Sequence, residues 1–377
     1  MKTKAAVLYE MGASPPYAES QPLRIDEISL AGPGRGEVLV EIAGAGLCHS
    51  DLSVVDGSRP RTMPMVMGHE ASGIVREVGA EVNEFAPGDP VVFSFVPICG
   101  RCRFCASGRG ALCEAGAQAN IAGTLLSGAR HFADSNSTVC NHHLGVSGFS
   151  QFTVAAQESL VKIDASLPLA TAALFGCAVM TGVGAIVNTA RVMPGTSVAV
   201  FGMGGVGLSA VMGARAAGAY PIVAVDKLED KLKIASQVGA THTVNAAQED
   251  PIAAVKDLTG GGADNALESV GNEQVLIQAY QATKRGGTTI TIGLPAPGKL
   301  FSIPAVSLTM EERTIKGSYM GSSVPRRDIP RYIGMYLAGL LPVDKLYTHT
   351  LRLDDINLGF DRLAQGIAVR QIVSFAE

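Results

Sequence analysis

Four cysteines crowd into one short stretch of this 377-residue chain, with the spacing Cys99-x-x-Cys102-x-x-Cys105 followed by Cys113. Four thiolates complete a tetrahedral zinc shell with no open position, so the stretch predicts a structural zinc site within a loop over 95–115. An iron–sulfur cluster is the rival interpretation, but its common run ends with a shorter gap and a proline. Here the last gap is seven residues long and no proline follows, which favours zinc.

A second group with metal-binding chemistry is dispersed along the chain. Cys48 and His69 each follow a run typical of a β-strand, and Cys177 lies where the sequence texture changes. Two thiolates and one imidazole leave a fourth zinc position open to water or a substrate oxygen, as catalysis requires. The sequence does not show that the three residues meet, and a lone cysteine such as Cys177 is also typical of a small buried core residue.

A glycine-rich run predicts a dinucleotide site. Gly202, Gly204 and Gly207 form a GxGxxG that includes Gly205 and Val206, follows an apolar strand and opens a helix. These glycines permit the tight turn, the approach of the pyrophosphate and close helix packing. Asp226 follows 19 residues after Gly207, where a carboxylate would bind the ribose hydroxyls and repel a 2′-phosphate. We therefore expect NAD to be preferred over NADP, with Lys231 softening that preference.

The regions around these motifs differ in the pattern of strands and helices that they predict. The part before about residue 163 contains short β-type runs separated by glycine and proline, and indicates a β-rich domain. After Pro194, strands and helices alternate, which predicts a doubly wound parallel sheet of the α/β class. The expected strands are 197–201, 221–225, 241–244, 263–268, 288–292 and 314–319, and the expected helices are 206–217, 229–237, 251–258 and 273–283.

Composition limits the classes of function. Charged residues make up 17% of the chain and the net charge is −4, which favours neither nucleic acid nor a membrane surface as partner. The chain has no stretch typical of a secretory signal, and its cysteines cluster as they do in metal sites. We expect a cytoplasmic protein.

Taken together, these motifs resemble the zinc-containing medium-chain alcohol dehydrogenases over essentially the whole chain. The similarity rests on Gly68 to Gly73, the four-cysteine loop, Gly202 to Gly207 with Asp226, and the runs 238–241 and 268–271. It is greatest for the dimeric alcohol and glutathione-dependent formaldehyde dehydrogenase branch. The resemblance implies a GroES-like catalytic domain over 1–178 and 321–377 and a Rossmann domain over 179–320. It further implies a homodimer, with a homotetramer as the alternative.

The resemblance also implies roles for individual residues. Cys48, His69 and Cys177 would hold a catalytic zinc, the second of two zinc ions per subunit. Asp51 would orient His69, Glu70 would lie behind the metal, and Ser50 would relay the proton of the alcohol. Further NAD contacts would come from His49, Thr181, Ile292, Leu294 and Arg370, and the substrate cleft would be lined by Phe95, His143, Leu144 and Tyr319.

Two departures from the family pattern bear on mechanism. Many relatives complete the proton relay with a histidine at the position of Ser53, and many carry an aromatic residue at the position of His143. The imidazole of His143 would bind a polar substrate or would be a core histidine.

Other functions compete with alcohol oxidation. The nearest is oxidation of a thiol adduct of formaldehyde, for which Arg59 and Arg61 would bind the carboxylates of the thiol. A zinc-free quinone or enone reductase would lack the Cys48, His69 and Cys177 set, and a non-enzymatic binding protein would not need Ser50.

Overall fold

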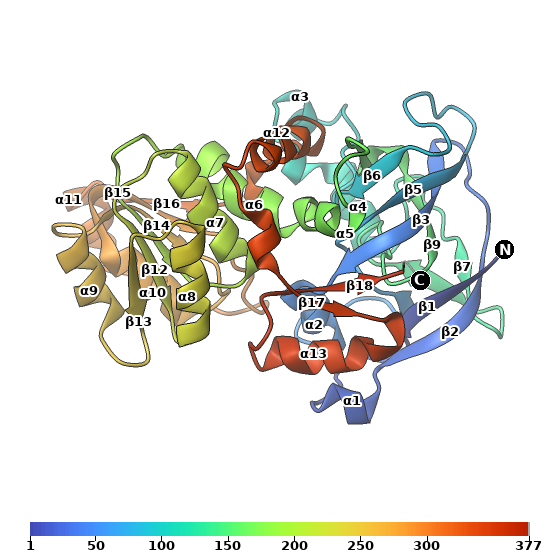
Figure 1. Ribbon diagram of the computed structural model, residues 1–377, viewed down its shortest axis with the longest axis horizontal. Coiled ribbons are helices and arrows are strands. Elements are labelled where there is room, and N and C mark those ends of the chain that lie inside the picture. Colours follow the sequence, from blue (N-terminus) through green and yellow to red (C-terminus); the bar gives the residue numbers. More distant parts are fainter. Residues whose placement is uncertain (376–377) are drawn as a thin grey trace. The chain divides into compact units, whose positions relative to one another are not determined.

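Short strands build the first of two units in the computed structural model, which describes residues 1–375 (Figure 1). This unit comprises Met1–Cys177, Val324–Pro330 and the described residues from Tyr347 onward. Its closed barrel has the order β1 (Lys2–Leu8), β2 (Leu23–Leu30), β7 (Phe132–Ala133), β8 (Val139–His142) and β4 (Met65–Val66). Its sheet has the order β10 (Leu160–Lys162), β6 (Pro90–Phe93), β5 (Ala71–Val78), β3 (Glu37–Gly46), β18 (Arg370–Ser374) and β17 (Tyr347–Leu351), and β9 (Phe152–Ala156) also pairs with β3.

The apolar core of this unit joins strands of very different lengths. Residues from β1, β2, β3, β4, β7, β8 and β9 meet in one buried cluster that includes Val7, Ile28, Val66 and Phe132. Because each strand supplies alternate side chains to that cluster, a few residues per strand suffice to fill it. Helices cover the remainder: α1 (Tyr17–Ser20), α2 (His49–Val55), α3 (Arg103–Ala106), α4 (Glu114–Ala122), α5 (Leu169–Ala172) and α13 (Ile356–Ala364).

The second unit confirms the predicted alternation of strands and helices. Its six strands are all parallel, in the order β13 (His242–Asn245), β12 (Ile222–Asp226), β11 (Val198–Phe201), β14 (Ala263–Glu268), β15 (Thr283–Thr291) and β16 (Thr314–Gly317). The four expected helices form as α7 (Gly205–Ala216), α8 (Glu229–Val238), α9 (Pro251–Leu258) and α10 (Glu273–Ala282), and they flank the sheet (Figure 1). The unit also contains α6 (Ala178–Gly184) and α11 (Ala305–Met310).

The domain bounds differ from those expected in one substantial respect. The second unit comprises Ala178–Ser323 and Arg331–Leu346, whereas we expected all of 321–377 in the catalytic domain. That expectation is wrong for Arg331–Leu346. The helix α12 (Pro325–Leu337) passes from one unit to the other, and its buried Tyr332 receives a hydrogen bond from Asn188 in the second unit.

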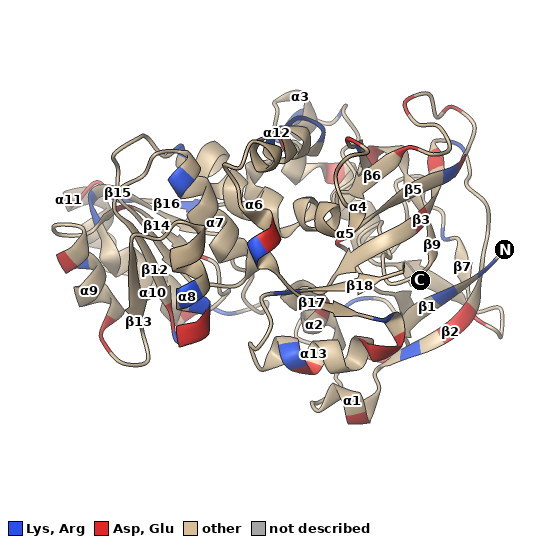
Figure 2. Ribbon diagram, viewed as in Figure 1, with Lys and Arg blue, Asp and Glu red and all other residues tan. Residues whose placement is uncertain are grey.

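Exposed helices carry charges of both signs. Figure 2 shows Lys or Arg beside Asp or Glu on α8 and on α13, and Lys233 pairs with Asp230 at 2.9 Å on α8. This interspersion agrees with the small net charge.

No single helix among residues 1–375 has both the length and the apolar composition to cross a membrane. Two consecutive helical segments, Leu169–Gly176 and Ala178–Ala190, reach that length and apolar composition only in combination, and they are bent by 47° where they meet.

Candidate active site and metal centres

Three side chains predicted to bind a catalytic metal meet inside the first unit. Cys48 precedes α2, Cys177 follows a short 3-10 helix, and His69 follows Gly68, whose φ of +95° and close surroundings exclude a side chain there. The Cys177 Sγ lies 3.4 Å from the His69 Nε2. Tetrahedral zinc, with Zn–S of about 2.3 Å and Zn–N of about 2.0 Å, would separate such atoms by about 3.5 Å. The donor set therefore fits one zinc ion.

Asp51 fixes two of these ligands with one buried carboxylate. Its Oδ1 lies 2.9 Å from the His69 Nδ1, and its Oδ2 accepts the Cys48 backbone N–H at 3.2 Å. Burial by itself would lower the pKa of His69, but the Asp51 carboxylate outweighs it and raises that pKa well above its usual value. Because Nδ1 faces Asp51, Nε2 is the ring nitrogen that faces Cys177, and a metal bound there would take the place of its proton.

Glu70 supports the same assignment. Its carboxylate is fully buried, neither oxygen has a hydrogen-bond partner, and Oε1 lies 3.9 Å from the Arg370 Nε. Gly46 makes room for it, since a Cβ there would come within 2.5 Å of Oε1. Burial raises the pKa of Glu70 to about 7, although the charge of Arg370 opposes the shift. A buried carboxylate without a hydrogen bond beside two thiols is more stable with a cation nearby.

Arg370 is itself buried, with 3% of its surface exposed. Its Nη2 lies 4.0 Å from the Cys48 Sγ and its Nη1 donates to the Leu47 carbonyl at 3.5 Å. The structure thus places it against the metal ligands, and its contact with the cofactor phosphates stays a prediction, as does that of the exposed His49.

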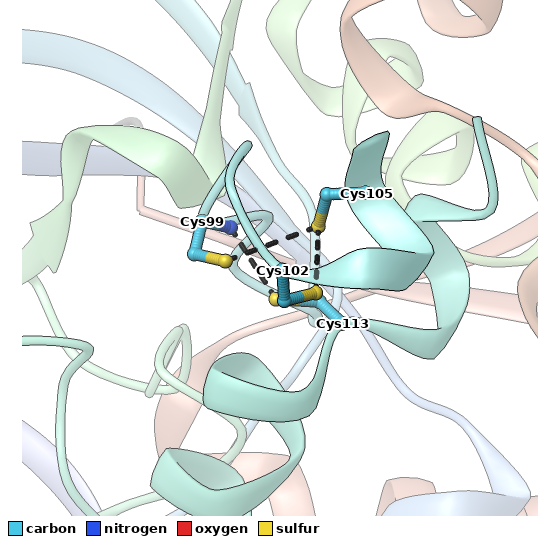
Figure 3. A group of neighbouring side chains, drawn as sticks. All are labelled: Cys99, Cys102, Cys105 and Cys113. Atoms are coloured by element: carbon cyan, nitrogen blue, oxygen red, sulfur yellow. Dashed lines mark hydrogen bonds between the residues drawn. The ribbon is translucent and has the colours of Figure 1, made fainter. Parts of the chain in front are cut away.

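The four cysteine side chains of this loop gather in one cluster, and none of them forms a disulfide bond (Figure 3). The Cys102 Sγ lies 3.4 Å from the Cys105 Sγ, which lies 3.9 Å from the Cys99 Sγ. The backbone N–H groups of Cys99 and Gly116 donate to the Cys113 Sγ. Four thiolates around zinc are separated by about 3.8 Å, so this cluster fits a closed zinc shell. Backbone hydrogen bonds lower the pKa of Cys102 to about 6, which favours the thiolate form that binds a metal.

The glycine-rich turn lies in the second unit, between β11 and α7. Gly202 has a φ of +96°, and a Cβ on Gly207 would lie 1.8 Å from the Gly202 carbonyl oxygen. No atom lies within 4 Å of the place where a Cβ of Gly204 would be, so the space above it is open. Gly205 and Val206 begin α7, whose N–H groups face that space in the manner of an anion site.

Asp226 closes β12 beside this turn. Its Oδ2 accepts the Met203 backbone N–H at 2.6 Å and its Oδ1 accepts the Leu228 N–H at 3.0 Å. The carboxylate is therefore fixed at the carboxyl end of the strand, where a ribose would lie in the Rossmann arrangement. Lys231 lies in the first turn of α8.

Glu268 is a positioning residue of this unit to which sequence reasoning assigned no role. Its buried carboxylate accepts the N–H groups of Val270 and Gly271 at 2.7 and 2.6 Å, and its backbone carbonyl accepts the Ile292 N–H at 2.8 Å. It thus joins the end of β14 to the segment that contains Ile292 and Leu294. The signal for it was the acidic residue at the end of an apolar strand.

The remaining site residues fall in both units. Phe95 and His143 are buried, and each ring lies 5.6 Å from that of His69, edge to face. Leu144 follows with a φ of +52°, and Ser50 is half-buried in the first turn of α2. Thr181 on α6 and Tyr319 belong to the second unit, and their predicted roles stay predictions.

Comparison with known proteins decides the family. The alcohol dehydrogenase GroES-like domain matches residues 34–165 and the zinc-binding dehydrogenase domain matches 205–337. The protein named alcohol dehydrogenase D in Mycobacterium tuberculosis, itself a provisional assignment, is 42% identical and covers 99% of this chain and 100% of its own length. The chain belongs to the zinc-containing medium-chain alcohol dehydrogenase family. The predicted fold, a Rossmann sheet with a β-rich GroES-like domain, is confirmed.

This alcohol dehydrogenase is also similar to two relatives whose names specify a cofactor or a substrate. The NDMA-dependent alcohol dehydrogenase of Amycolatopsis methanolica is 40% identical, with 99% of each chain covered. The structure of benzyl alcohol dehydrogenase from Acinetobacter calcoaceticus aligns with a TM-score of 0.91 at 33% identity, with 100% of each chain covered.

Proposed function

We propose that this alcohol dehydrogenase exchanges hydride between NAD and a primary or secondary alcohol, including aromatic alcohols. The observation that supports this most is the buried group of Cys48, His69 and Cys177, whose ligand atoms lie within 4.8 Å of one another. Asp51 orients His69 within this group. Zinc held by Cys48, His69 and Cys177 would lower the pKa of an alcohol hydroxyl, and bound NAD would supply the acceptor for the hydride of the adjacent carbon. The similarity to a benzyl alcohol dehydrogenase and the rings of Phe95 and His143, each in contact with His69, favour aromatic substrates.

The chain's own residues would orient the reactants and move the proton. Asp51 holds His69 in one ring orientation, and the apolar ring of Phe95 excludes water from its face. The Ser50 Oγ would accept the hydroxyl proton of the alcohol and pass it to water. Ser53 cannot continue this relay easily, because its own hydroxyl donates to the His49 carbonyl at 2.9 Å.

We also propose two zinc ions per chain, one at each cysteine-containing group. The Cys99, Cys102, Cys105 and Cys113 site has no open position and would be structural. All seven cysteines are unpaired, which supports a reducing compartment such as the cytoplasm.

Ser50→Ala should lower kcat about 100-fold, because the proton of the alcohol loses its first acceptor. Ser53→Ala is the matched control and should change kcat only slightly, since its hydroxyl is engaged with the backbone. Steady-state rates over a range of pH values would measure both. Similar losses in the two variants would contradict a relay that begins at Ser50.

Asp226→Ala should reduce kcat/KM for NAD about 10- to 100-fold, because the ribose loses a charged hydrogen-bond acceptor. The same variant should gain efficiency with NADP, since the repulsion of a 2′-phosphate is removed. Asp230→Ala is the control: Asp230 also lies near the start of α8 but pairs with Lys233. An unchanged cofactor ratio in Asp226→Ala would contradict the assignment.

We propose that two copies associate through the open edge of the parallel sheet, with a tetramer as the larger alternative. Among the described strands, β16 pairs only with β15. Just before it in the chain, α11 exposes Val306 and Met310, with exposed fractions of 59% and 69%. Unpaired edges beside apolar side chains favour strand pairing between chains. Light scattering should give at least twice the chain mass of 39.0 kDa, and a single chain mass would refute the assembly.

The decisive test of function is a panel of linear, branched and aromatic alcohols assayed for the oxidised product, with NADH formation followed in the arm with NAD alone. Three arms separate the candidates: NAD alone, NAD with NDMA, and NAD with formaldehyde plus a thiol. Activity with NAD alone would support the proposal. Activity only with NDMA would point to the cofactor use that the name of the Amycolatopsis relative indicates. Activity only with the thiol adduct would establish the formaldehyde reaction.

A further inference from the structure

The carboxylate that orients His69 is shared with a second imidazole. The His143 Nδ1 lies 3.1 Å from the Asp51 Oδ1, the oxygen that His69 approaches at 2.9 Å. The His143 Nδ1 does not meet the geometry of a hydrogen bond, so this contact is a close polar approach to the carboxylate, whereas His69 is hydrogen-bonded to it. The two imidazole planes are inclined at 83°. His143 is 1% exposed and Asp51 is fully buried, so water cannot replace this contact easily.

The backbone holds His143 in place independently of its ring. Its N–H is shared between the Val66 carbonyl at 3.3 Å and the Ser147 Oγ at 3.0 Å. Its carbonyl accepts the N–H groups of Val146 and Ser147 at 3.1 and 3.3 Å. The backbone at His143 is therefore fixed by a closed turn after β8, independently of the contact between the imidazole and Asp51.

Geometry supports a donor role for the His143 Nδ1. A ring nitrogen 3.1 Å from a buried carboxylate oxygen, which can only accept, is suited to present an N–H to it. Asp51 is thus approached by three N–H groups, from Cys48, His69 and His143, and these come from three separate segments of the chain.

We propose that His143 is a positioning residue for the catalytic metal: through Asp51, it holds His69 in the orientation that binds zinc. The proposal rests on the proposed function, because it takes Cys48, His69 and Cys177 to be the zinc ligands. Without the donor on His143, the Asp51 carboxylate keeps only its contacts with the Cys48 N–H and with His69, so its Oδ1 is less strictly oriented toward His69. Outer partners of metal ligands typically change metal affinity about 10- to 100-fold.

Two substitutions separate the donor from the ring. His143→Phe keeps an aromatic ring of similar size but removes the N–H group, whereas His143→Asn loses the ring but retains an amide N–H near the position of Nδ1. Competition with a chelator should show that His143→Phe binds zinc at the Cys48, His69 and Cys177 site about 10-fold more weakly than the unchanged protein. His143→Asn should retain most of the affinity of the unchanged protein. Cys48→Ser removes one ligand of the Cys48, His69 and Cys177 site, so the zinc that is missing from this variant is the one bound there.

Cobalt in place of zinc provides a second readout, because its visible absorption reports the ligand geometry. A shifted spectrum is expected in His143→Phe and a nearly unchanged one in His143→Asn. Equal zinc affinity in His143→Phe and the unchanged protein would overturn the proposal. So would a loss of zinc affinity in His143→Asn when His143→Phe keeps it. If the unchanged protein binds only one zinc and Cys48→Ser releases none, the proposed function fails too, so the two failures are distinguishable.

Discussion

Replacing Cys48 with serine should remove the metal from its site with His69 and Cys177 and lower kcat at least about 1000-fold. The reason is that a serine hydroxyl is a poor zinc ligand, and without the metal an alcohol hydroxyl keeps a pKa far above neutrality. Zinc content should fall by one ion per chain, and alcohol-dependent NADH formation should fall with it. Metal analysis and initial rates on the same preparation would measure both.

Cys140→Ser is the matched control for this experiment. Cys140 is fully buried in the barrel core, and burial raises the pKa of its thiol to about 11, so it stays an uncharged packing residue. This variant should keep both zinc ions and most of the activity. Substantial activity in Cys48→Ser with its zinc lost would show that the reaction does not use this site.

Replacing Cys102 with serine should have the largest effect on stability. The loop from Cys99 to Cys113 is largely exposed and contains only the short helix α3 and one 3-10 turn, and the four sulfur atoms join its two ends. Zinc binding by four thiolates contributes directly to folding. We expect the melting temperature to fall by about 10 °C, because several kcal/mol of metal-coupled folding are lost.

Ser107→Ala serves as its control, since the Ser107 hydroxyl donates only to the Phe104 carbonyl in the same loop. Differential scanning calorimetry with zinc analysis would measure the effect, and limited proteolysis should place the new cleavage within 99–113. A melting temperature equal to that of the control, with one zinc lost, would contradict a structural role for this metal.

Local patterns predicted the second unit closely. The expected helix over 251–258 and strand over 263–268 form with those bounds, and the other elements shift by a few residues at their ends. Strand and helix periodicities are properties of neighbouring residues, so they can be read without knowledge of the fold. Element ends depend on capping and packing, as at Cys48, whose role as the N-cap of α2 involves the Asp51 side chain.

The sequence by itself determined the four-cysteine loop, the dinucleotide turn with Asp226 and the alternation of the parallel sheet. Each of these follows from residue types at short, fixed spacings. Only the tertiary structure decided that Cys177 meets His69 across 108 positions, that Asp51 lies between His69 and His143, and that Arg331–Leu346 belongs to the second unit. These contacts join segments that are distant in the chain, so they depend on the packing of whole elements rather than on any local pattern.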